Sequence, residues 1–165
     1  MKKYLSLFYL ISLLFNFTLF ANDDLNSSVN SYTNIDEQKV FNTVKEMYEK
    51  MSPDFIVYTT WDQLHLMKRS TFGFLNIDIK VDNILLSYLP SKDKNTTNIK
   101  LEIFQTNQYE TKVTDTNPFA YELFWNRLEY ALGKTDKLID CTYEPKANMF
   151  VHNPLCKMEK ESFLP

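Results

Sequence analysis

The sequence predicts an α+β fold: an antiparallel four- or five-stranded meander sheet, an N-terminal and a C-terminal helix packed on one face, and a disulfide-stapled C-terminal tail. Three observations predict it. Apolar residues recur at helical spacing in two segments, 36–50 and 118–132. Between them, short stretches rich in β-branched and aromatic residues alternate apolar with polar positions. The connections are short, which favours antiparallel neighbours, and two amphipathic helices on one face can bury a single core.

The first helix is expected over Asp36–Lys50. Asn34 and Glu37 have the spacing of a capping box, with Asn in place of Ser or Thr. Ser52-Pro53 ends the helix, because the residue before proline avoids the helical region. Its apolar stripe consists of Val40, Phe41, Val44, Met47, Tyr48 and Met51.

The strands are expected in the middle of the chain. The segment 75–81 alternates strictly between apolar and polar residues, and Asp82-Asn83 is expected to be a turn into the next strand. His65 is interpreted as a partly exposed strand residue. The remaining strand segments are 54–61, 84–89, 99–104 and the more polar 109–115.

The second helix is expected from Pro118 to Leu132. Asn117 suits the N-cap, and Pro118 suits the first helical position because its missing N–H costs nothing there. Gly133 suits a left-handed C-cap. Tyr121, Phe124, Leu128 and Leu132 form the buried stripe.

The N-terminus predicts export. A basic pair, Lys2-Lys3, precedes the apolar run Tyr4–Phe20 and then Ala21, which is the order of a signal peptide covering residues 1–21. An uncleaved membrane anchor is the alternative, and membrane association is expected only if this segment is retained. Residues 22–33, rich in Asn, Ser and Asp, are expected to be a disordered linker. Residues 34–165 then form a single α+β domain in the periplasm.

Cys141 and Cys156 are the two cysteines of the chain. In an oxidising compartment an even count favours pairing, and a loop of this length contributes about 3 kcal/mol in the chain-entropy model. A soft-metal site of Cys141, His152 and Cys156 is the alternative. A cysteine nucleophile is less favoured, because a paired thiol cannot attack.

Composition excludes several classes of function. With two glycines there is no glycine-rich phosphate loop, so no nucleotide is expected. No nucleotide fingerprint and no helical metal-binding motif occurs in the sequence, and no cofactor is expected. A formal net charge of −3 argues against a nucleic-acid partner. Carboxylates such as Asp62, Asp82 and Glu102 are dispersed, so a hydrolase assembled from them in space stays an alternative to a binding protein.

Two sets of residues are candidate sites. Asn26 and Asn95 lie in "DLNSS" and "DKNTT", which resemble the acidic-x-Asn-x-Ser/Thr acceptor of bacterial N-glycosylation. Five aromatic residues are candidates for a ligand groove between sheet and helices, although core packing is the favoured interpretation: Tyr58, Trp61, Tyr88, Tyr109 and Trp125.

The stretch "YELFWNRLEYALGKTDKLIDC" followed by "NPLC" (Tyr121–Cys156) resembles the C-terminal end of a group of proteobacterial envelope proteins, often lipoproteins. The resemblance implies an envelope location and agrees with pairing of the two cysteines. The helix–sheet–helix order is similar to the helix-grip domains of outer-membrane assembly lipoproteins, a likeness of fold that does not fix function.

The expected function is that of an exported, non-enzymatic binding or assembly module whose partner is another envelope protein.

Overall fold

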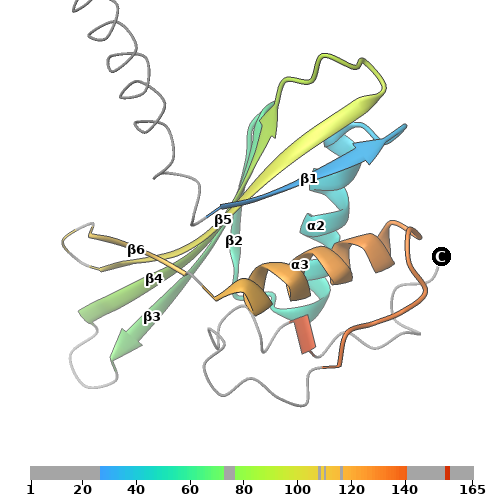
Figure 1. Ribbon diagram of the computed structural model, residues 1–165. Coiled ribbons are helices and arrows are strands. Elements are labelled where there is room, and N and C mark those ends of the chain that lie inside the picture. Colours follow the sequence, from blue (N-terminus) through green and yellow to red (C-terminus); the bar gives the residue numbers. More distant parts are fainter. Residues whose placement is uncertain are drawn as a thin grey trace, which may run out of the picture.

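The computed structural model describes residues 27–72, 77–107, 109, 111–115, 117–140 and 155–156. Both described helices lie on the same side of one antiparallel sheet, which confirms the predicted α+β architecture (Figure 1). The elements are β1 (Ser27–Thr33), α2 (Glu37–Met51), β2 (Ile56–Thr59), β3 (Gln63–Phe72), β4 (Ile77–Leu89), β5 (Thr96–Asn107), β6 (Lys112–Thr114) and α3 (Pro118–Ala131). Neither described helix is long and apolar enough to span a bilayer.

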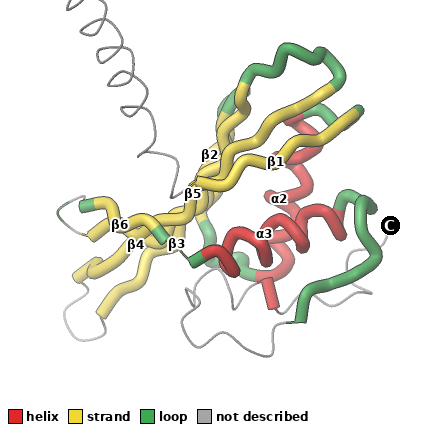
Figure 2. The backbone as a smooth tube through the Cα atoms, viewed as in Figure 1, coloured by secondary structure: helices red, strands yellow, loops and turns green. Residues whose placement is uncertain are grey.

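The sheet has the strand order β1-β5-β4-β3-β2, with β6 also paired to β5. Strands β2 to β5 follow one another as a meander, as expected. Strand β1 pairs with Thr96–Glu102 and β6 with Phe104–Thr106, so the two lie end to end along the edge of β5 that β4 leaves open (Figure 2).

Strand β1 corrects the linker prediction for residues 27–33. An edge strand needs only one partner strand and one buried row of side chains. A segment that is polar at most other positions can therefore form an edge strand, although its composition resembles that of a linker. Tyr32 is only 3% exposed, and the Trp125 indole Nε1 donates to Ser28 Oγ at 2.7 Å. These contacts hold a polar segment against β5 and α3.

The α2 cap also differs from the prediction. The N-cap is Asp36, whose carboxylate accepts from the Lys39 backbone N–H at 2.7 Å, so the capping box built on Asn34 is wrong. Asn34 instead has a left-handed φ of 59°, a conformation that Asn tolerates, and it turns the chain from β1 into α2.

The predicted turn at Asp82-Asn83 is wrong as well, because β4 runs straight through it. The two residues are 5% and 2% exposed. Buried polar groups persist in a strand when they are hydrogen-bonded, and both are: Gln105 Nε2 donates to Asp82 Oδ1 at 2.7 Å, and Asn83 Nδ2 donates to the Val81 carbonyl at 2.8 Å.

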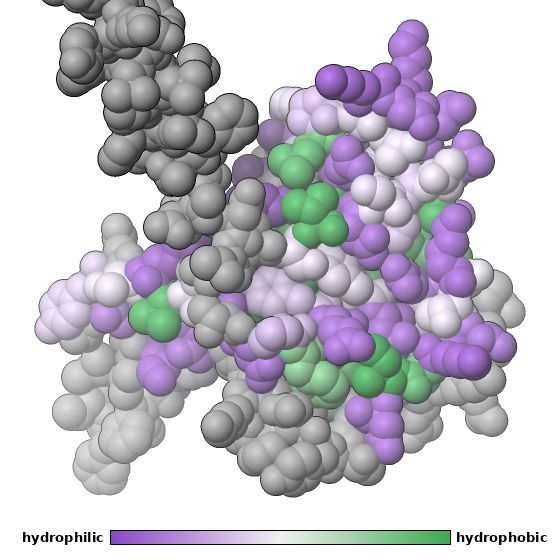
Figure 3. All heavy atoms as spheres, viewed as in Figure 1, coloured by the Kyte–Doolittle hydropathy of each residue, from purple (hydrophilic) through white to green (hydrophobic). Residues whose placement is uncertain are grey.

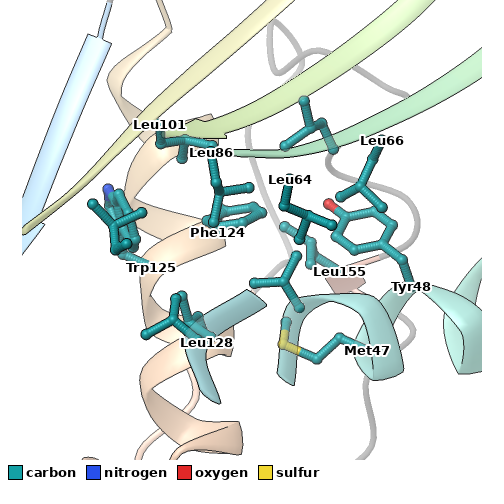
Figure 4. Close-up of a cluster of buried hydrophobic side chains, with 14 of the residues drawn as sticks. Met47, Tyr48, Leu64, Leu66, Leu86, Leu101, Phe124, Trp125, Leu128 and Leu155 are labelled. Carbon is teal, nitrogen blue, oxygen red and sulfur yellow. The ribbon is translucent and has the colours of Figure 1, made fainter. Parts of the chain in front are cut away.

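Helix α3 follows the prediction closely. The Asn117 side chain accepts from the Phe119 N–H, Pro118 opens the helix, and Gly133 has a φ of 69° just after its end. The core lies between the two helices and the sheet (Figure 4). Its fully buried side chains include Phe41, Met47, Tyr48, Leu64, Leu66, Leu86, Leu101, Phe124, Leu128 and Leu155.

The chain after α3 is held by Arg127, which is 3% exposed. Its guanidinium donates to the carbonyls of Leu155 and Ile139 at 3.0 and 2.8 Å, and to Asn126 Oδ1. Cys141 and His152 lie outside the described residues, so the disulfide with Cys156 and the alternative metal site both stay predictions. Residues 1–26, and with them the signal peptide and Asn26, also lie outside the described residues.

Candidate binding surface

The sheet has one covered and one open face. Side chains that point toward the helices are fully buried, among them Leu64, Leu66, Ile84, Leu86, Ile99, Leu101 and Ile103. Because successive strand residues point to opposite sides, the residues between them lie on the other face. No described helix lies on that side (Figure 1), and we call it the outer face.

One edge of the outer face is apolar and exposed. On β2, Ile56 and Tyr58 are 44% and 55% exposed, and Trp61 in the following turn is 74% exposed. Register places Ile56 opposite Met67 and Tyr58 opposite His65 on β3. Large exposed aromatic residues beside aliphatic ones are typical of surfaces that bind other proteins.

A hydrogen-bond network lies at the centre of the outer face. His65 Nε2 is 2.9 Å from Asn83 Oδ1, and Asn83 Nδ2 donates to the Val81 carbonyl and to Thr106 Oγ1. A carbonyl can only accept, so the nitrogen of the Asn83 amide faces Val81 and its oxygen faces His65. His65 Nε2 therefore carries a hydrogen, and in the neutral ring Nδ1 is left as an acceptor.

The opposite half of the outer face is charged. Lys112 Nζ lies 3.3 Å and Lys100 Nζ 3.9 Å from the same Glu102 oxygen. Lys112 Nζ also lies 4.3 Å from the centroid of the Phe104 ring, a cation–π arrangement. The Phe104 ring is in turn 6.3 Å from the His65 ring, which connects the charged half to the central network.

The five aromatic residues named as candidates for a ligand groove do not lie together. Trp125 is 8% exposed and belongs to the core, 5.5 Å edge-on from Phe124. Tyr109, which is 78% exposed, lies between β5 and β6. Tyr88 is opposite Ile99 on the covered face, whereas Tyr58 is on the outer face. Tyr58 on β2 and Trp61 in the turn that follows it are both exposed.

Tyr88 instead lines a surface hollow of about 500 Å³ between the start of α2 and the β4–β5 turn. Two of its three carboxylates have structural partners: Asp36 caps α2, and Asp93 accepts from the Asn95 N–H and the Thr96 hydroxyl. These bonds lower the pKa of Asp93. Asn95 is exposed here, and its glycosylation stays a prediction.

The carboxylates of the described sheet do not converge. Asp82 is on the covered side of β4 with Gln105, whereas Glu102 is on the outer face. Burial raises the pKa of the Asp82 carboxyl, but the hydrogen-bond partner that the structure gives His65 is Asn83. Among the described residues no three His, Cys, Asp or Glu side chains are grouped as metal ligands.

In the view of Figure 3, which shows the β1 and α3 side, apolar side chains form small separate areas among hydrophilic ones.

The chain matches no protein-family profile, no curated protein sequence and no solved structure. The resemblance to proteobacterial envelope proteins therefore stays an expectation, and the functional argument rests on the geometry.

Sequence patterns missed most of this surface. The sequence predicts a strand at His65 but a turn at Asn83, and no motif includes Lys100 or Lys112. The available signal was the alternation in 99–104, which puts Lys100, Glu102 and Phe104 on one face.

Proposed function

We propose that this chain is an exported bacterial envelope protein that acts in the periplasm as a non-enzymatic binding module, with another envelope protein as its partner. The outer face is the binding surface. The observation that carries the proposal is the exposed β2 edge, where Ile56, Tyr58 and Trp61 are 44%, 55% and 74% exposed beside a face that no described helix covers. The part-exposed His65 adds a directional polar group beside this apolar edge, and its hydrogen bond to the buried Asn83 holds it in place.

Photocrosslinking in the cells that produce the protein tests the proposal. A photoreactive amino acid at Tyr58 should give a discrete higher-mass species. The matched control is the same amino acid at Glu46, which is exposed on the solvent side of α2, and it should give none. Ile56→Glu should weaken the Tyr58 crosslink.

Absence of crosslinks at Tyr58, or the same products at both positions, would argue against the outer face as the binding surface. Hydrolase turnover by the purified protein that one Asp or Glu substitution abolishes would favour the enzymatic alternative.

A further inference from the structure

Building on this proposed binding function, we propose that the outer face receives an amphipathic helix of a partner protein, with an apolar stripe over β2 and β3 and an acidic flank over β5 and β6. Three features of the outer face lead to this partner: the sign of its charges, the separation of its apolar and charged halves, and its width.

The net charge of the outer face is opposite in sign to the net charge of the whole chain. Lys100 and Lys112 on this face share the single carboxylate of Glu102, so these three side chains leave one positive charge in excess. The whole chain has a formal net charge of −3. A local excess of cations beside an apolar patch attracts a partner that brings carboxylates, because complementary charges steer association and fix orientation.

The two halves are separated by the width of one helix. Neighbouring strands lie about 4.8 Å apart, so three intervals place β2 roughly 14 Å from β5. A helix with its side chains is about 10–12 Å wide. One helix along the sheet can therefore contact Ile56 and Tyr58 with one flank and approach Lys100 and Lys112 with the other.

Two other occupants fit the surface less well. In a second copy packed face to face by a two-fold axis parallel to the strands, the cations of β5 and β6 would lie against the apolar residues of β2, and with an axis across the strands they would lie against their own copies. An anionic membrane is usually recognised by clusters of about four to eight cations. This face has Arg69, Lys100 and Lys112, with Glu102 among them.

The test is a selection on the purified full chain from a displayed library of 20-residue helices. All members share one leucine stripe, and the flanking positions vary among Glu, Lys, Gln and Ser. We expect Glu to be enriched at least fivefold over Lys along one flank. Lys100→Glu/Lys112→Glu should reverse that preference, and the neutral Lys100→Gln/Lys112→Gln should abolish it, which keeps the test valid if charge reversal impairs folding.

Other outcomes would overturn the proposal. Enrichment without charge preference, enrichment of Lys, or no enrichment at all would each do so. Sedimentation of the protein with phosphatidylglycerol vesicles but not with phosphatidylcholine vesicles would favour a membrane. A dimer in analytical ultracentrifugation that Ile56→Glu dissociates would favour a second copy. If the crosslink at Tyr58 in cells persists while the charge preference fails, the binding function stands and only the partner chemistry is wrong.

Discussion

Replacing Arg127 by methionine should detach the C-terminal segment from α3. The guanidinium donates to the buried Leu155 carbonyl at 3.0 Å and to the Ile139 carbonyl at 2.8 Å. A hydrogen bond from a charged donor contributes about 1.5–3 kcal/mol, and a buried group left without its partner costs about 1–3 kcal/mol. Burial of the cation, which lowers the pKa of Arg127, offsets part of this. We therefore expect Arg127→Met to lower the free energy of unfolding by about 3–5 kcal/mol.

Urea denaturation followed by tryptophan fluorescence measures this loss, and limited proteolysis should show earlier cleavage after α3. Arg127→Lys keeps the charge but not the fork that spans two carbonyls, so it should lose less than methionine does. Lys45→Met is the matched control, since Lys45 is exposed and makes only a 3.7 Å pair with Glu49; its effect should stay within about 0.5 kcal/mol. A loss below about 1 kcal/mol for Arg127→Met, at unchanged m-value, would refute the reasoning.

Three further predictions concern Tyr48, Asp82 and the two cysteines. The buried Tyr48 hydroxyl has no partner among the described residues, so Tyr48→Phe should leave the free energy of unfolding in urea unchanged or raise it by up to about 1 kcal/mol; a clear loss would show a bonded hydroxyl. Burial raises the pKa of Asp82 in the folded state above 3.8. The protonated carboxyl therefore contributes to the free energy of unfolding below the unfolded-state pKa. This contribution is lost as the pH rises through the folded-state pKa. Asp82→Asn, which keeps the oxygen that Gln105 bonds, should flatten this decline in stability, and an unchanged pH profile would contradict the assignment. Alkylation with intact-mass measurement should find thiols at Cys141 and Cys156 only after reduction; thiols in the untreated protein would rule out the predicted disulfide.

The helices could be predicted to within a residue or two at each end. Asp36–Lys50 was expected and Glu37–Met51 is observed; Pro118–Leu132 was expected and Pro118–Ala131 is observed. Helix signals are local, since the stripe, the proline and the terminal glycine all lie within one or two turns of the residues they define. The side of the sheet that the helices cover follows from the alternation of apolar residues along strands such as 99–104.

Strand β1 shows why part of the sheet could not be predicted. Its composition is that of a linker, and the groups that order it are remote: Trp125 bonds Ser28 across 97 residues, and Asn30 Nδ2 donates to Glu129 across 99. No window of sequence contains both partners. On the edge of β1 away from β5, the Ser31 N–H donates to Asn30 Oδ1 at 2.8 Å. This N–H is therefore not offered to a further strand, which limits pairing of β1 with another chain.

The dipeptide Asp82-Asn83 connects the fold to the candidate surface. Neighbouring strand residues point to opposite faces, so Asp82 meets Gln105 on the covered face while Asn83 meets His65 and Thr106 on the outer face. A slip of β4 by one residue would turn each side chain away from its partners and leave both without hydrogen bonds. The pair therefore favours one register among β3, β4 and β5. That register places Asn83 between Met67 and Phe104 and His65 opposite Leu85 on the outer face, so the polar residues that looked like a turn help to align the three central strands of the proposed binding surface.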